Sequence, residues 1–230
     1  MDKLKWSIAQ LVKDIDPQVG ILDKEGCLLF DYASKIPTKG LIIEIGSWRG
    51  RSTVWLGQGA MFRGGKVLAV DPHEGMEGFG ESYNEFLNNI ERCKVSNNVM
   101  PILLTSKVFF ENYTEKVDMV FIDGLHDYPT VLNDTLESLD HLKEGGILAM
   151  HDTIAYKGPY KVLKMVMFWD NRMRVLKQVG QVTVLRKTKP SILNIISNYF
   201  FYIYFELYSL LFLTAHLFFP KFLKEKIKSI

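Results

Sequence analysis

The sequence predicts an α/β protein in which a mostly parallel sheet is covered by helices on both faces. From residue 41 onward, short apolar segments alternate with segments of helical periodicity. The apolar segments lack the polar alternation of a half-exposed sheet, so both of its faces should be buried. Two later strand-like segments are separated by Gly180, which indicates an antiparallel hairpin at one edge.

The individual elements follow in chain order. Residues 1–21 form a cap segment, whose helix is predicted from apolar residues at helical spacing, namely Leu4, Ile8, Leu11, Val12 and Ile15. The predicted parallel strands are residues 41–46, 66–71, 100–105, 117–123 and 145–152, and the hairpin is residues 174–187. A helix that begins near residue 129 is predicted to continue until Gly145 and Gly146 stop it.

Composition limits the class of protein. The chain has 230 residues, of which 47% are hydrophobic and 23% charged, as expected for a globular protein. A net charge of +2 gives no indication of a nucleic-acid partner. Cys27 and Cys93 are far apart and lack metal-site spacing, which indicates two reduced thiols in a cytosolic protein.

The segment "EIGSWRGRST" connects the first predicted strand to its helix and is typical of a ligand-binding loop. Gly46 and Gly50 allow the backbone to approach a ligand, and Ser52 or Thr53 is expected to cap the helix. The spacing excludes a phosphate-binding P-loop and matches a dinucleotide fingerprint poorly. S-adenosylmethionine fits better, because carboxylates stand where its amino group and its ribose would need them, at Glu44 and Asp71.

Together with "VLAVD", "FIDGLHDY" and "LKEGGILAMHDT", this loop resembles the class I S-adenosylmethionine-dependent methyltransferases. The nearest branch includes macrocin-type sugar O-methyltransferases and cephalosporin-hydroxylase-like proteins. The resemblance covers residues 22–187 and implies a Rossmann-like seven-stranded sheet with an antiparallel last strand. It implies a cofactor site formed by Glu44, Gly46, Ser47, Gly50, Ser52, Thr53, Asp71 and Ser106.

Polar residues follow the fourth and fifth predicted strands. Asp123 and Asp152 should lie close together, because these strands are neighbours in the family. Facing carboxylates repel unless they share a proton or a cation, so Mg²⁺ or another divalent cation is expected at Asp123, His151 and Asp152. His151 stands where relatives commonly carry glutamate, which departs from the family pattern. His126 matches the general base of the sugar-methylating relatives, so the expected catalytic residues are His126, Asp123 and Asp152.

Residues 190–230 form an apolar tail that follows the methyltransferase domain, residues 22–189. On a helix, its polar residues share about one third of the circumference, namely Asn194, Asn198, Tyr202, Glu206, Ser209 and His216. Basic residues flank both ends of this helix, so a membrane span would export one cluster, contrary to the positive-inside rule. The tail is therefore predicted either to lie on a membrane surface or to form a homo-oligomer interface.

The expected function is O-methylation of a hydroxyl on a sugar, a glycolipid or a related small molecule, assisted by a divalent metal. Loops at residues 72–82 and 153–161 are expected to shape the acceptor pocket. The expected location is the cytoplasm, with peripheral contact to the cytosolic face of a membrane. Two other functions stay open, a non-catalytic membrane-associated binding module and a dinucleotide-binding α/β protein.

Overall fold

A computed structural model describes the chain except for residues 1, 18–19, 75–80 and 219–230. Part of the loop expected to cover the acceptor pocket, residues 75–80, therefore lies outside the described residues. The described strands are β1 (Leu41–Ile45), β2 (Lys66–Val70), β3 (Val99–Ile102), β4 (Val117–Ile122), β5 (Leu142–Met150), β6 (Met173–Val179) and β7 (Val182–Lys187). The described helices are α1 (Asp2–Val12), α2 (Asp23–Ala33), α3 (Arg51–Met61), α4 (Tyr83–Arg92), α5 (Ser106–Asn112), α6 (Tyr128–His141), α7 (Lys157–Trp169) and α8 (Ile192–Phe218).

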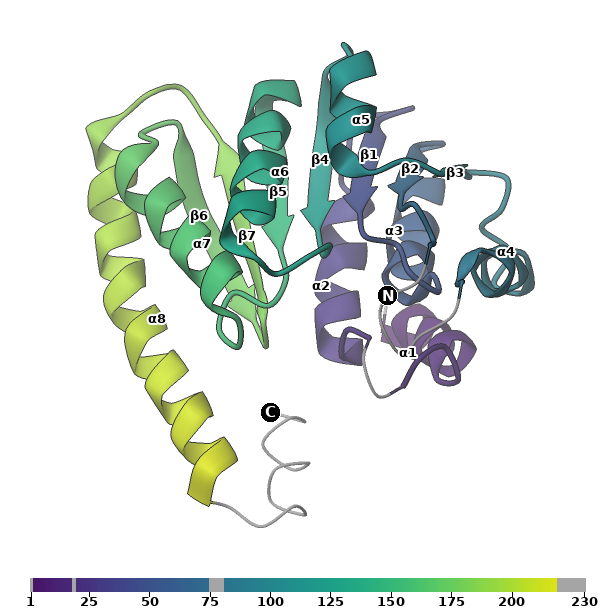
Figure 1. The fold of residues 1–230 in the computed structure, drawn as a ribbon, viewed down its shortest axis with the longest axis horizontal. Helices are drawn as coiled ribbons and strands as arrows, with labels where there is room; N and C mark the ends of the chain where they lie inside the picture. Colours follow the sequence, from purple (N-terminus) through teal and green to yellow (C-terminus); the bar gives the residue numbers. More distant parts are fainter. Residues whose placement is uncertain (1, 18–19, 75–80, 219–230) are drawn as a thin grey trace.

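The described strands form one seven-stranded sheet in the order β3-β2-β1-β4-β5-β7-β6. Strands β1 to β5 run parallel, and β7 pairs antiparallel with both β5 and β6. Helices cover both faces of the sheet (Figure 1). This arrangement confirms the predicted Rossmann-like α/β fold, including the antiparallel hairpin.

The sheet separates two hydrophobic clusters, one on each face. Along β4, Met119 and Phe121 enter the cluster formed with α1, α2, α3 and α4. The residues between them, Val120 and Ile122, enter the cluster on the opposite face, with α5, α6 and α7. Successive side chains of a strand point to opposite faces, so a strand buried on both sides has an uninterrupted apolar sequence.

The boundary between α6 and β5 differs from the prediction. The helix ends at His141 rather than at the two glycines, and β5 begins at Leu142. Leu142 has an extended backbone and pairs with Val117 of β4. Residues that the sequence pattern assigned to the helix therefore belong to the sheet. Lys187 reinforces this end of the helix, because its Nζ donates a hydrogen bond to the Leu142 carbonyl.

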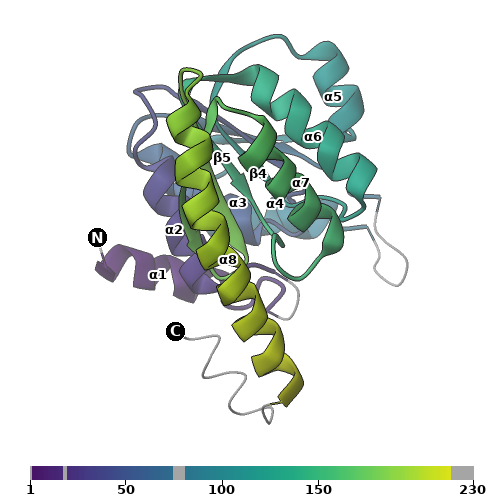
Figure 2. The same cartoon turned by 90° about the vertical axis from the view of Figure 1, so that its left-hand side faces the viewer.

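Helix α8 packs along the β6 side of the sheet, between α2 and α7 in the view of Figure 2. The polar residues Asn194 and Asn198 are buried against the domain, with Phe205 beside them. Asn198 accepts a hydrogen bond from the Val175 amide and donates to the carbonyls of Met167 and Met173. The part of the predicted polar stripe from Asn194 to Ser209 is therefore the side that docks, and His216 lies outside the described side chains. In the part of the chain that the structure describes, no helix is both long and apolar enough to cross a bilayer.

Candidate active site

The candidate site lies where the parallel strands β1, β2, β4 and β5 end, at the lower side of the sheet in Figure 1. Because these strands are parallel, their carboxyl ends meet at one edge, and ligands bind there in open α/β sheets. Glu44 lies in β1 and Asp71 follows β2, whereas Asp123 follows β4 and Asp152 comes two residues after β5. The structure therefore brings the residues predicted from separate segments to the same edge.

The loop after β1 approaches the end of β4 closely. Gly46 has a φ of 82°, and a side chain at this position would place its Cβ 2.3 Å from the carbonyl oxygen of Asp123. Gly50 has a φ of 88° and is the N-cap of α3. The expected capping role of Ser52 or Thr53 is therefore wrong, because the left-handed glycine starts the helix earlier. Both hydroxyl residues lie inside α3 and are buried.

Glu44 is fully buried and has one oxygen available for a ligand. Its Oε2 accepts a hydrogen bond of 2.6 Å from the Thr53 hydroxyl. Burial raises the pKa of Glu44 to about 8, although hydrogen bonds from Ser52 and Thr53 act in the opposite direction. Among the described residues, neither Glu44 Oε1 nor the Ser47 hydroxyl has a hydrogen-bond partner. Buried polar atoms without partners are costly, so this pair fits a polar ligand such as the amino-acid end of S-adenosylmethionine.

Asp71 is held rigidly at the end of β2. Its carboxylate accepts hydrogen bonds from the backbone amides of Trp48 (2.8 Å) and His73 (2.7 Å).

Ser106 begins α5 and donates a hydrogen bond to Asp134 of α6. Burial raises the pKa of Asp134 to about 6, and its Oδ1 has no partner among the described residues. Asp134 is not among the site residues predicted from the sequence, because it lies within an ordinary amphipathic helix.

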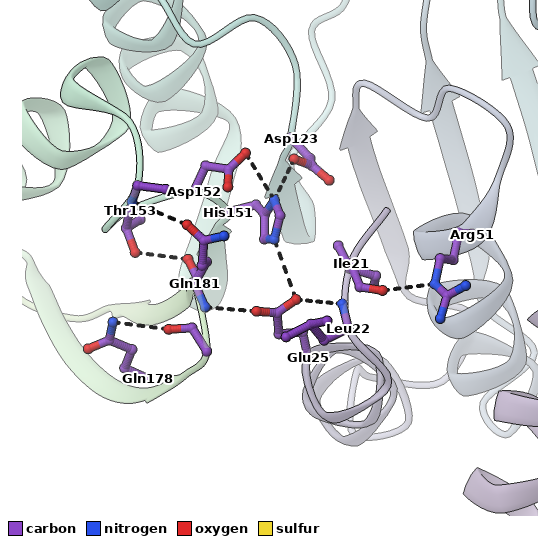
Figure 3. Close-up of polar contacts among 12 residues, drawn as sticks. Ile21, Leu22, Glu25, Arg51, Asp123, His151, Asp152, Thr153, Gln178 and Gln181 are labelled. Atoms are coloured by element: carbon purple, nitrogen blue, oxygen red, sulfur yellow. Dashed lines mark hydrogen bonds and ion pairs between the residues drawn. The ribbon is translucent and has the colours of Figure 1, made fainter. Parts of the chain in front are cut away.

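His151 connects three carboxylates (Figure 3). Its Nδ1 lies 2.9 Å from Asp123 Oδ1 and 3.4 Å from Asp152 Oδ2, and its Nε2 lies 3.5 Å from Glu25 Oε2. Glu25, in the first turn of α2, is only 1% exposed. Its oxygens also accept hydrogen bonds from the amides of Leu22 (2.7 Å) and Gln181 (2.8 Å). Glu25 therefore joins the N-terminal segment and the β6–β7 hairpin to the site.

The charges of this cluster depend on one another. Burial opposes ionisation of His151, yet the neighbouring carboxylates outweigh it and raise its pKa well above 6.5. Burial also raises the pKa of Asp123, with partial compensation by His151. For Asp152, contacts with His126 and His151 outweigh burial and hold the pKa below its ordinary value. The geometry thus favours an imidazolium at His151 beside an ionised Asp152.

His126 lies on the solvent side of the cluster, with its side chain 35% exposed. Its Nε2 is 2.8 Å from Asp152 Oδ2, and its ring stacks on that of Tyr156 at 4.1 Å between centroids. Asp152 itself has a φ of 56°, an unusual left-handed conformation that aims its carboxylate at both histidines. Asp123, His126 and His151 line a small pocket with Gly124, Val131 and Pro159.

The cluster contains a group of side chains that could hold a divalent cation. Single ligand atoms of Asp123, His126 and Asp152 lie within 4.8 Å of one another, close enough to share an ion. His151 was expected as a ligand, and the structure does place it between the two aspartates. Both of its ring nitrogens face carboxylates, whereas the carboxylate contact of His126 involves Nε2. Among the described residues, the group whose ligand atoms lie close enough to share an ion is Asp123, His126 and Asp152.

Comparison with known proteins identifies the domain. Residues 43–153 match a family model described as a methyltransferase domain, a range that includes Glu44, Asp71, Asp123, His126 and Asp152. This match favours the first of the three functions left open by the sequence over a dinucleotide-binding protein or a non-catalytic module.

Solved structures share the fold at low sequence identity. A cofactor-bound structure of Rv0187 from MTB has a TM-score of 0.62 at 17% identity, covering 82% of this chain and 89% of that one. The O-methyltransferase TomG from Streptomyces achromogenes, in complex with SAM, gives 0.60 at 17% identity, with coverage of 82% and 91%. An O-methyltransferase from Bacillus cereus in complex with SAH gives 0.60 at 18%, with coverage of 82% and 92%. Residues 43–153 therefore form a methyltransferase domain, and the chain has the fold that these structures share.

Proposed function

We propose that the protein transfers a methyl group from S-adenosylmethionine to a hydroxyl oxygen of a sugar, a glycolipid or a related small molecule. One observation carries the proposal: His126 Nε2 lies 2.8 Å from Asp152 Oδ2, beside a pocket at the carboxyl edge of a methyltransferase domain. A histidine oriented by a carboxylate is well suited to remove a hydroxyl proton near neutral pH.

The cofactor would lie against the loop between β1 and α3. Glu44 and Ser47 offer buried polar atoms without protein partners, which suit the amino-acid end of S-adenosylmethionine. Asp71, fixed by two backbone amides, suits the ribose hydroxyls, and Ser106 is proposed for the adenine side. When bound, the cofactor supplies a methyl group on a positively charged sulfur. The solved structures with SAM or SAH in the same fold support this choice of cofactor.

His126 would act as the general base. With Nε2 directed at Asp152, its Nδ1 receives the proton of the acceptor hydroxyl while the oxygen bonds to the methyl carbon and the carbon–sulfur bond breaks. Asp152 has a lowered pKa, so it stays ionised and stabilises the imidazolium that forms. His151 offsets the negative charge of Asp123 and Asp152 behind the pocket.

Aromatic side chains favour a sugar-like acceptor. Tyr156 stacks on His126 and is itself exposed, as is Tyr128 at the start of α6. Aromatic rings offer an apolar face together with a hydroxyl that forms hydrogen bonds, a combination that suits the mixed polarity of a sugar ring.

A divalent cation is a second way to activate the acceptor. It would be held by Asp123, His126 and Asp152, whose ligand atoms lie within 4.8 Å of one another. An ion in this position would act as a Lewis acid and lower the pKa of a bound hydroxyl. Because a ring nitrogen of His126 would then bind the metal, the two mechanisms predict different effects of a chelator.

The test is transfer of a labelled methyl group from S-adenosylmethionine to a panel of sugars and glycolipids. The His126→Ala variant should lose activity by about 10²- to 10⁴-fold, while calorimetry shows unchanged affinity for S-adenosylmethionine. Glu111→Ala, at an exposed position near the end of α5, is the control and should keep its rate within a few fold. A fully active His126→Ala variant would refute the proposed role of this residue.

Repeating the transfer assay in excess chelator distinguishes the two mechanisms. Activity that disappears in excess chelator and returns with Mg²⁺ supports the cation held by Asp123, His126 and Asp152. Full activity in chelator leaves the histidine alone to remove the proton. If the purified chain binds no S-adenosylmethionine at all, the proposed function itself is wrong.

A further inference from the structure

The outward face of α8 is an extended apolar surface. Many of its large side chains are more than half exposed, among them Ile192, Leu193, Tyr199, Phe200, Tyr204 and Leu207. With Ile196 and Ile203 between them, they fall within about 140° of the helix circumference at 100° per residue. We call these eight residues the outward face. Figure 2 shows α8 running along the outside of the domain.

The polar groups of α8 are turned away from this face. Asn198 is completely buried in three hydrogen bonds with α7 and β6. Glu206, the only acidic residue between 192 and 211, contacts Tyr160 and Lys164 of α7. The side that docks thus combines these polar contacts with the fully buried Phe205, and a second apolar surface is left outside. An ordinary surface helix has polar side chains on its outer side.

The size of the outward face calls for a covering partner. If each of the eight side chains exposes about 100 Å², the face presents about 800 Å², whereas the largest apolar patch on a typical monomer is about 300–600 Å². A second copy of the chain or a lipid surface are the candidates. Area alone does not decide between them, because a symmetric pair of such faces would reach the size of a standard dimer interface.

Charge decides in favour of a lipid surface. Residues 157–211, which comprise α7, β6, β7 and the described side chains of α8, contain nine Lys and Arg but two Asp and Glu. This segment has a net charge of +7, so the other residues must sum to −5 in a chain of net charge +2. Lys161, Arg174 and Lys177 are exposed on the elements that pack beside α8. Two such surfaces would repel each other in a dimer, whereas an anionic bilayer would attract them.

The aromatic residues at this surface agree with a bilayer interface. Trp169, 85% exposed, ends α7, and its neighbour Phe168 contacts the rings of Tyr199 and Tyr202 on α8. Tyr199 and Tyr204 lie on the outward face. Tryptophan and tyrosine favour the headgroup region, because they combine an apolar ring with a polar group. We propose that the outward face of α8 lies in the plane of an anionic lipid bilayer, with α7 and β6 supplying the cationic flank.

The first test is flotation of the full chain with vesicles. Wild-type protein should float with phosphatidylcholine vesicles that contain phosphatidylglycerol and much less with phosphatidylcholine alone. The double variant Phe200→Asp/Leu207→Asp should lose this binding. The matched control Val108→Asp/Leu136→Asp adds the same charges at exposed apolar positions of α5 and α6 and should still bind. Fluorescence of Trp169 should shift to shorter wavelength with anionic vesicles, a change that Trp169→Phe removes.

A second test isolates the charges. Arg174→Glu/Lys177→Glu should lower the affinity for anionic vesicles about 25-fold or more, since each basic residue near the surface contributes about fivefold. Lys66→Glu/Lys107→Glu, at exposed positions on β2 and α5, should change it little. Equal binding to neutral and anionic vesicles would overturn the proposed attraction. A wild-type homodimer that ignores vesicles and becomes monomeric in Phe200→Asp/Leu207→Asp would overturn the lipid proposal and assign the face to a second copy.

Discussion

Replacing Glu25 with alanine should destabilise the folded protein much more than an ordinary helix-terminal substitution. Glu25 is almost fully buried, and its carboxylate accepts hydrogen bonds from the amides of Leu22 and Gln181 while facing His151. Alanine leaves both amides without an acceptor and removes one of the three carboxylates around a cationic imidazole.

The magnitude follows from these three contacts. An unpaired buried amide costs about 1–3 kcal/mol, and the lower value applies here because Leu22 and Gln181 are only partly buried. The two amides therefore account for about 2 kcal/mol. His151 keeps Asp123 and Asp152, so losing its 3.5 Å contact with Glu25 adds only about 1 kcal/mol. The expected loss of unfolding free energy is about 3 kcal/mol, a large part of the total stability of a typical domain.

Urea denaturation followed by tryptophan fluorescence measures this loss, and the midpoint should fall by about 1 M or more. Glu85→Ala is the matched control. Glu85 also lies in the first turn of a helix and pairs with Arg49 at 2.9 Å, but its side chain is 56% exposed. An exposed pair contributes about 0–1 kcal/mol, so this variant should denature almost like the wild type. If both variants lose the same stability, the described role of Glu25 is refuted.

Three further outcomes are expected. Asp71→Ala should weaken S-adenosylmethionine binding about 10- to 100-fold in calorimetric titration, as for loss of a charged hydrogen-bonding group; unchanged affinity would contradict the ribose role. Asn198→Ala should lower the unfolding free energy by about 2–3 kcal/mol, because three backbone partners are orphaned; the partly exposed Ser197→Ala is its control in urea denaturation. Glu44 has a folded pKa of about 8, above its ordinary 4.5, so it contributes stability that is full below pH 4.5 and lost as the pH rises through 8. Glu44→Gln should flatten this part of the profile measured by thermal unfolding without cofactor, and an unchanged profile would argue against burial as the cause.

The sequence predicts this fold well wherever a buried strand is an uninterrupted apolar segment. Uninterrupted apolar segments such as that of β4 reflect burial on both faces, and Gly180 marks the hairpin between β6 and β7. The carboxyl ends of parallel strands meet, so Glu44, Asp71, Asp123 and Asp152 could be placed at one edge from their positions alone.

Other features depend on contacts between distant parts of the chain, which leave no pattern in the local sequence. Glu25 reaches Gln181 across 156 positions in the chain, and within its own segment it is an ordinary acidic residue in a first helical turn. Leu142 fits the apolar stripe of α6, but pairing with β4 outweighs the helical preference. The left-handed conformation of Asp152 is likewise set by its surroundings rather than by its residue type.

The placement of β7 has a consequence for synthesis of the protein. Because β7 lies between β5 and β6, the edge of β5 has no strand partner until residues 182–187 have left the ribosome. A nascent chain of about 150 residues would already contain β1 to β5, yet it would expose an apolar strand edge, a template for mispairing with other chains. Gln181, whose backbone amide donates a hydrogen bond to Glu25, leaves the ribosome at the same stage. The order of synthesis therefore delays completion of the sheet, and of the Glu25 contact at its carboxyl edge, until residues 182–187 have been made.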